Sequence, residues 1–211
     1  ALPPPAALLE DYRRLLETGQ LTNGETVARL ERAAAAYLGV EHCVAVSSCT
    51  SGLILVERCL GLRGEVIVPS FTFFATAHSL LWNSLDPVLV DCEAGSWNLD
   101  PERARRAITP ATSAILGVHL FGNPAAARKL EAIARRARVR LIFDAAHAFG
   151  ARIEGTPVGA FGDAEVFSLS PTKPLVAAEG GLVATRHATL ARDLRAARNY
   201  GHSGDYDCRL L

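Results

Sequence analysis

The sequence contains no methionine, and only two of its 22 basic residues are lysines, Lys129 and Lys173. Any chemistry that needs a primary amine therefore has two candidate residues. The five cysteines show no C-x-x-C spacing and have an odd total. This pattern favours free thiols in a reducing compartment over disulfides or a structural zinc site. We therefore expect no metal ligands in the chain.

Net charge and long apolar runs are also absent. The 22 basic and 22 acidic residues balance, which removes the general attraction that most nucleic-acid-binding proteins show. No apolar run approaches the roughly 18 to 20 residues that cross a bilayer, and residues 1–5 lack the basic and apolar regions of an export signal. We expect a cytoplasmic protein that binds neither nucleic acid nor membrane.

Short apolar runs alternate with helical patterns along most of the chain. Two amphipathic helices are expected first, one over Ala7–Leu16 and one that follows a capping box formed by Thr22 and Glu25. Seven strands are then expected, at residues 43–47, 65–68, 88–91, 113–118, 140–144, 165–169 and 182–185. Between them, helices are expected at residues 50–60, 73–83, 101–108 and 124–137, the last with Pro124 in its first turn.

This alternation predicts an α/β fold, a three-layer sandwich around a mostly parallel seven-stranded sheet. No clear helix separates the last two strands, which leaves room for one of them to run antiparallel. Ligands of such sheets lie at the carboxyl ends of the parallel strands. A Rossmann oxidoreductase has no support, because no G-x-G-x-x-G motif follows the first strand.

Unusual polar and aromatic residues follow several of these strands. Ser47–Gly52 leads from the first strand into a helix, where amides and hydroxyls can converge on a phosphate, although serine and threonine are also ordinary helix caps. The aromatic residues after the second strand either pack in the core or stack on a planar ligand. Asp144 ends an apolar strand and needs a partner, which is either an arginine or a ligand.

Lys173 stands at the exit of the sixth strand, opposite Asp144, in a chain that uses arginine almost everywhere else. A lysine amine forms a Schiff base, whereas a guanidinium does not. Lys129 lies within a helix beside charged residues and is expected at the surface. Together these residues offer a phosphate-binding turn, an aromatic side chain, a carboxylate and an amine at one edge of the sheet. Pyridoxal 5′-phosphate (PLP) requires each of these groups.

With these motifs, the chain resembles the DegT/DnrJ/StrS group of sugar-nucleotide aminotransferases, within the fold-type I PLP enzymes, along essentially its whole length. The resemblance rests on a combination of segments, namely 18–24, 47–51, 69–76, 118–122, 144–148, 168–173, 179–181 and 198–201. It implies that Lys173 is the Schiff-base lysine and that Asp144 pairs with the pyridine nitrogen.

The remaining site residues are also carried over from the resemblance. Thr50 and Ser51 would hold the phosphate by backbone N–H and hydroxyl groups, with a side-chain contact from Ser168. Phe73 matches the aromatic residue that stacks on the cofactor ring. His147 stands where many members have glutamine beside the ring hydroxyl, and histidine can also donate there.

The resemblance implies a ping-pong transamination in which an amino acid, usually L-glutamate, supplies the amino group for a nucleotide-linked keto-sugar. The expected role is amino-sugar biosynthesis for an antibiotic or a polysaccharide. Two alternatives remain open: an aminotransferase for a keto-cyclitol or an aminated aromatic precursor, and a non-catalytic PLP-binding or regulatory relative. Retention of Lys173 favours transamination over the dehydration that relatives with histidine at that position perform.

The resemblance also implies a domain organisation and an assembly. Residues 1–40 are expected to form a helical segment that packs on a PLP-binding large domain, residues 41–211. The smaller C-terminal domain of the family is expected to be missing from this chain. The active site is expected at the interface of a homodimer.

Overall fold

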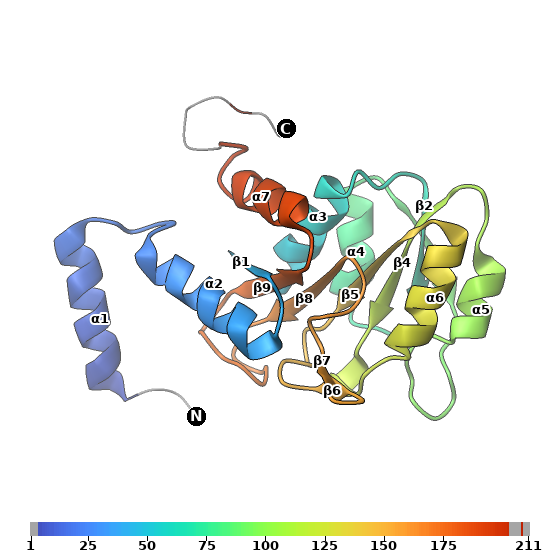
Figure 1. Ribbon diagram of the computed structural model, residues 1–211, viewed down its shortest axis with the longest axis horizontal. Helices are drawn as coiled ribbons and strands as arrows, with labels where there is room; N and C mark the ends of the chain where they lie inside the picture. The colour runs from blue at the N-terminus through green and yellow to red at the C-terminus, as the bar shows by residue number, and fades with distance from the viewer. Residues whose placement is uncertain (1–3, 203–207, 209–211) are drawn as a thin grey trace.

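The computed structural model describes residues 4–202 and residue 208, and it is built around one seven-stranded sheet (Figure 1). The order across the sheet is β1-β9-β8-β5-β4-β2-β3. The sheet contains all seven strands expected from the sequence. Their bounds are β1 (His42–Val46), β2 (Glu65–Pro69), β3 (Asp86–Val90), β4 (Thr112–Val118), β5 (Arg140–Asp144), β8 (Ala164–Ser168) and β9 (Gly181–Thr185).

One strand, β9, runs antiparallel to both of its neighbours, while the pairs β2–β3, β2–β4, β4–β5 and β5–β8 are parallel. This confirms that one of the last two strands is antiparallel. Gly181 begins β9 and pairs with Val46 at the end of β1 and with Ser168 at the end of β8. The start of β9 therefore lies at the same edge where the parallel strands end.

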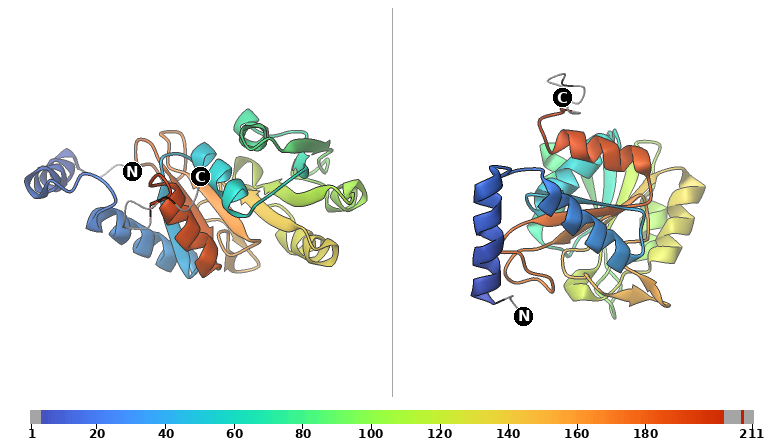
Figure 2. Two further views of the ribbon diagram at one scale, coloured as in Figure 1. Left: turned by 90° about the horizontal axis from the view of Figure 1, so that it is seen from above. Right: turned by 60° about the vertical axis from the view of Figure 1, so that its left-hand side comes forward.

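Helices cover both faces of the sheet, which confirms the three-layer sandwich (Figure 2). Along β5, Ile142 packs beneath one helical layer, whereas Leu141 and Phe143 pack beneath the other, as the two-residue period of a strand requires. The first layer contains α3 (Cys49–Cys59), α4 (Phe74–Trp82) and α7 (Ala188–Ala197), and the second contains α2 (Glu25–Leu38), α5 (Pro101–Ala107) and α6 (Ala127–Ala137).

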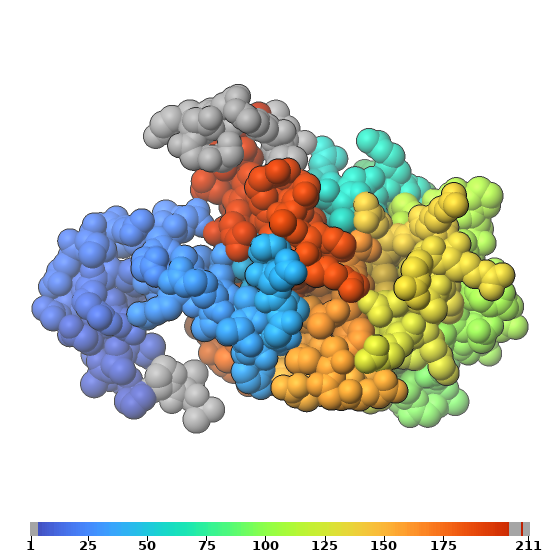
Figure 3. Space-filling model, viewed as in Figure 1, coloured from blue at the N-terminus to red at the C-terminus, as the bar shows by residue number. Residues whose placement is uncertain are grey.

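The two N-terminal helices differ in their packing. In α2, Ala34 and Leu38 are buried in a core cluster with strand residues such as Phe167. In α1 (Pro5–Thr18), no residue is buried, and the helix forms one edge of the molecule (Figure 3). Within the described residues, no helix is long and apolar enough to cross a membrane.

The capping box expected at Thr22 is wrong. Helix α2 begins three residues later at Glu25, and Gly24 is its N-cap without a side-chain hydrogen bond. A β-carbon at Gly24 would lie 2.8 Å from the flexible side chain of Gln20, which would have to move to make room for any other residue. The reciprocal capping box that the structure does contain lies at the start of α3, between Ser48 and Ser51.

Other differences from the expected elements are local. Helix α6 begins at Ala127 rather than Pro124, because the amide of Ala125 donates to His119 Nδ1 and holds this segment outside the helix. The sequence analysis did not anticipate four elements, which are α7, the 3-10 turn η1 (Leu120–Gly122) and the hairpin of β6 (Arg152–Ile153) and β7 (Thr156–Pro157). The five cysteines are free thiols, as expected.

Candidate active site

A cavity of about 320 Å³ opens at the sheet edge where β1, β2, β4, β5 and β8 end. Its volume lies within the range of small-molecule sites. The structure brings six of the seven predicted site residues to its wall: Thr50, Phe73, Asp144, His147, Ser168 and Lys173. Further lining residues that the sequence analysis did not assign include Cys49, Thr72, His119, Ser170 and Glu179.

Asp144 is the last residue of β5, and only 6% of it is exposed. Its Oδ2 accepts a hydrogen bond of 2.8 Å from Thr76 Oγ1 on α4, and its Oδ1 accepts one of 3.0 Å from the amide of Ala146. These partners take the place of the arginine considered in the sequence analysis. The carboxylate therefore faces the cavity with its position fixed and its charge balanced by hydrogen-bond donors rather than by an ion pair.

The thiol of Cys49, the first residue of α3, also contacts Asp144. Its Sγ lies 3.8 Å from Asp144 Oδ1 and 3.5 Å from the carbonyl oxygen of Val166. Burial, together with the neighbouring carboxylate, raises the pKa of the Cys49 thiol well above its ordinary value. Cys49 therefore remains a protonated, weakly donating group rather than a nucleophile.

Lys173 follows β8, and its Nζ lies 2.9 Å from Nε2 of His147, which follows β5. Burial lowers the pKa of His147, and the charge of Lys173 lowers it further. His147 is therefore neutral near pH 7, and its Nε2 can accept a hydrogen bond from the amine. Lys129 is exposed on α6, as expected.

The N-terminus of α3 points its first amides at the cavity. The Ser48 side chain accepts from the Ser51 amide at 3.0 Å, and the Ser51 hydroxyl accepts from the Ser48 amide at 2.9 Å. Ser51 is thus engaged in the cap and does not line the cavity. The amides of Cys49 and Thr50 occupy the first two helical positions, where an α-helix offers no acceptor, and they are available to an anion.

A buried pair, His119 and Glu165, supports the floor of the site. His119 Nδ1 accepts from the amide of Ala125 at 2.9 Å, so the ring proton is on Nε2, which donates to Glu165 Oε2 at 2.9 Å. Glu165 Oε1 in turn accepts from two amides, those of Gly159 and Phe161. His119 belongs to segment 118–122, one of the segments that carry the family resemblance. Its position directly after an expected strand is the sequence feature that could have identified it as a site residue.

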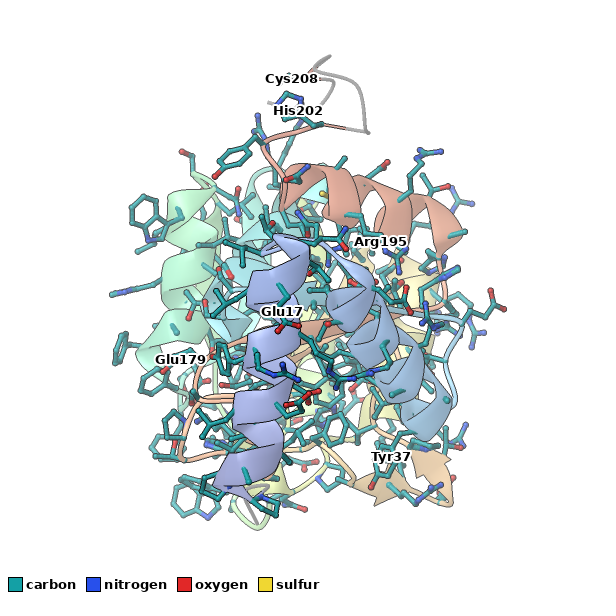
Figure 4. The ribbon with its side chains drawn as sticks, turned by 90° about the vertical axis from the view of Figure 1, so that its left-hand side faces the viewer. Glu17, Tyr37, Glu179, Arg195, His202 and Cys208 are labelled. Atoms are coloured by element: carbon teal, nitrogen blue, oxygen red, sulfur yellow. The ribbon has the colours of Figure 1, made fainter. Side chains whose placement is uncertain are left out.

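Two side chains complete the rim. Phe73 precedes α4, and its ring is 61% exposed, with its centroid 4.2 Å from that of Phe74. Glu179, labelled in Figure 4, lies in the loop before β9 and also lines the cavity. The cavity therefore combines an aromatic face, a buried carboxylate, an amine and a helix N-terminus.

Residues 6–210 match the model of the DegT/DnrJ/EryC1/StrS aminotransferase family. The chain belongs to this family. It is 41% identical over 197 residues to a UDP-N-acetyl-3-dehydro-α-D-glucosamine 3-aminotransferase of Acidithiobacillus ferrooxidans, covering 92% of this chain and 53% of the relative. It is 35% identical over 211 residues to a dTDP-4-amino-4,6-dideoxy-D-glucose transaminase of Shigella dysenteriae, covering 100% of this chain and 58% of the relative.

A solved structure shows the same architecture. The crystal structure of DesI in the presence of its TDP-sugar product superposes with a TM-score of 0.92 at 46% identity, covering 95% of this chain and 52% of DesI. This family member therefore spans about half the length of the curated relatives it matches.

Aminotransferases of this family use PLP. The donor set of the cavity fits that group, because a buried carboxylate, a helix N-terminus and a lysine amine converge on a single space.

Proposed function

We propose that this chain forms the PLP-binding part of an aminotransferase that transfers an amino group to a nucleotide-linked keto-sugar, in amino-sugar biosynthesis. The observation that carries the proposal is the convergence of Lys173, Asp144 and the N-terminus of α3 on one cavity. These three elements match the reactive aldehyde, the pyridine nitrogen and the phosphate of PLP.

Each residue has a distinct part in holding the cofactor. Lys173 would hold it covalently through Nζ, and Asp144 would pair with the pyridine nitrogen. Phe73 would stack on the ring, and His147 would donate to the ring hydroxyl through a nitrogen that Lys173 does not use. Thr50 would bind the phosphate through its amide and hydroxyl, with Ser168 adding its hydroxyl. Ser51 would act on the phosphate site by capping α3.

When bound, PLP supplies an electron sink for the carbon that loses its proton. After the amino donor displaces it from the cofactor, Lys173 Nζ would take this proton and deliver it to the cofactor carbon that carried the aldehyde. Because His147 Nε2 lies 2.9 Å away, it would hold the amine in place during the transfer. The carboxylate of Asp144 would keep the proton on the pyridine nitrogen, since it is buried and fixed by donors from two elements.

The substrate class is inferred from the relatives, whose names give UDP- and dTDP-linked sugars. We propose a keto-sugar linked to a nucleoside diphosphate as the acceptor and L-glutamate as the donor. The aminated product would be used in the synthesis of an antibiotic or a polysaccharide. We place the protein in the cytoplasm, where its five free cysteines would stay reduced.

We further propose a homodimer with the active site near the interface. Large apolar side chains are exposed around the cavity mouth and along α4. They include Phe73 at 61% exposure, Phe74 at 62%, Trp82 at 77% and Phe121 at 74%. Exposed apolar surface of this kind marks an interaction site. Sedimentation of the wild-type chain and of Trp82→Ser would test this, because the substitution should shift the equilibrium towards monomer.

Cofactor uptake tests the proposed function. The chain is titrated with PLP and the bound form followed by absorbance, for wild type, Asp144→Asn and Asp91→Asn. Asp91 also follows a strand of the sheet but is exposed and lies outside the cavity. The account expects Asp144→Asn to bind about tenfold more weakly or worse, because it removes a charged partner of the ring. Asp91→Asn should match wild type, and equal binding by all three would overturn the proposal.

The acceptor is tested separately, with UDP- and dTDP-linked keto-sugars and a keto-cyclitol. Each is mixed with the chain after loading with PLP and glutamate, and 2-oxoglutarate and the aminated product are measured. Amination of a nucleotide-linked sugar alone is the expected result. Amination of the keto-cyclitol alone would replace the proposed substrate class.

A further inference from the structure

Thr76 lies outside the residues assigned so far, yet it makes the closest contact to Asp144. It is completely buried in the first turn of α4, and its Oγ1 donates to Asp144 Oδ2 at 2.8 Å. We propose that Thr76 is a positioning residue that orients the Asp144 carboxylate towards the pyridine nitrogen of PLP. This inference rests on the proposed function.

The Asp144 carboxylate fixes the direction of both hydrogen bonds of the Thr76 hydroxyl. An ionised carboxylate only accepts, so the hydroxyl proton of Thr76 must point at Asp144. The oxygen of Thr76 also lies 2.8 Å from Thr72 Oγ1. Because the Thr76 proton is already used, Thr72 must be the donor in this second bond. Thr72, on the cavity wall, therefore locks the rotation of the Thr76 hydroxyl.

The two oxygens of Asp144 are held from different parts of the molecule. Oδ1 accepts from the amide of Ala146, two residues along the same chain segment, and weakly from the Cys49 thiol at 3.8 Å, whereas Oδ2 depends on Thr76 from α4. The terminal torsion of an aspartate is soft. Without the Thr76 hydroxyl, the carboxylate keeps its hydrogen bond from the Ala146 amide but loses the donor that fixes the plane of the carboxylate.

Thr76 also links Asp144 to the aromatic rim. Its amide donates to the carbonyl oxygen of Phe73 at 3.0 Å, which closes the first turn of α4. Phe73 and Thr76 are therefore joined by a backbone hydrogen bond, and Thr76 contacts Asp144 directly. The first turn of α4 therefore links Phe73, which would stack on the cofactor ring, to Asp144, which would pair with the ring nitrogen.

The test compares Thr76→Val, Thr76→Ser and Ser79→Ala. Thr76→Val removes the hydroxyl while keeping the branched shape, and Thr76→Ser keeps the hydroxyl. Ser79 is a matched control, because it is completely buried on the same helix and donates to a carboxylate, Glu57, at 2.6 Å, away from the cavity. Its contact with Thr76 is to the backbone carbonyl, at 2.9 Å, and not to the hydroxyl. For each variant, the PLP dissociation constant, the absorbance band of bound PLP and the melting temperature are measured.

Thr76→Val should bind PLP about tenfold more weakly and shift the absorbance band, since a hydrogen bond to a charged group contributes free energy of this order. Thr76→Ser should restore both readouts. Ser79→Ala should lower the melting temperature but leave affinity and band unchanged.

A folded Thr76→Val variant with wild-type affinity and band would overturn the role of Thr76 alone. The same holds if Ser79→Ala weakens PLP binding as much as Thr76→Val does, because the effect would then follow stability. A wild-type chain that binds no PLP would overturn the proposed function and this role together.

Discussion

The Nζ of Lys173 lies 2.9 Å from Nε2 of His147, and the two side chains reach each other from the ends of adjacent strands, β8 and β5. With Lys173 as the donor, the contact requires a neutral imidazole, because a protonated ring has no acceptor nitrogen. The lowered pKa of His147 provides this neutral form, and burial is its main cause.

His147 should make the chain sensitive to acid. A histidine with a lowered pKa in the fold stabilises the protein above the ordinary histidine range, and this contribution is lost as the pH falls through the lowered value. Wild type should therefore lose more unfolding free energy between pH 7 and pH 5 than His147→Gln, measured by urea unfolding. Parallel curves for the two proteins would show that His147 does not titrate in this way.

Glu57 should have the opposite pH dependence. It is buried between α3 and α4, and burial raises its pKa to about 7, although Ser79 and Asn83 donate to it. Its contribution to stability is fully present below about pH 4.5 and is lost as the pH rises through about 7. The full loss amounts to about 3 kcal/mol.

Substituting Glu57 with glutamine tests whether the loss of stability at high pH comes from Glu57. The Glu57→Gln variant has no proton to lose, so its urea midpoint should change less than that of wild type between pH 5 and pH 8. If both proteins lose the same stability over this range, another group is responsible.

Gly181 should tolerate no side chain. A β-carbon there would lie 2.6 Å from the carbonyl carbon of Ser48 and 2.8 Å from the amide nitrogen of Cys49, both backbone atoms at the start of α3. Gly181→Ala should therefore destabilise the chain by about 1–3 kcal/mol and weaken PLP binding. Gly95→Ala is the control, because nothing lies within 4 Å of the added carbon. Equal urea midpoints for the two variants would contradict this close approach.

Glu31 should contribute strongly to the attachment of helix α2 to the sheet and to α7. It is 6% exposed on α2, and it accepts from the Ala45 amide, from Arg195 at 3.0 Å and from Arg198 (Figure 4 labels Arg195 between α7 and α2). Glu31→Ala leaves the Ala45 amide without its acceptor and removes the carboxylate that Arg195 and Arg198 share, so it should cost about 3 kcal/mol.

The control for Glu31 lies on the same helix. Glu25 is 74% exposed and pairs with Arg32 at the surface. Glu25→Ala should change the unfolding free energy by less than about 1 kcal/mol. Similar urea midpoints for the two alanine variants would refute the central role of Glu31.

Sequence patterns predicted the strands and the strand-end residues, because both depend on local periodicity. Asp144 was predicted in this way, at the end of an apolar strand, and Lys173 was predicted from its place in the loop after the sixth strand and from the scarcity of lysine. Thr76 and Cys49 were not, since their contacts to Asp144 cross from α4 and α3 and arise only when the helices pack on the sheet. The start of α2 was misplaced because the Thr22 and Glu25 pattern indicates a capping box, whereas the backbone enters the helix at Gly24, which has no side chain to signal it.

Covalent attachment of PLP to one of the two lysines tests the central claim most directly. The chain is incubated with PLP and reduced with borohydride, and the modified peptide is identified by mass spectrometry, for wild type, Lys173→Arg and Lys129→Arg. The account predicts an adduct on Lys173 in wild type and in Lys129→Arg, and none in Lys173→Arg, which keeps the charge. An adduct confined to Lys129, or no adduct in any of the three proteins, would contradict it.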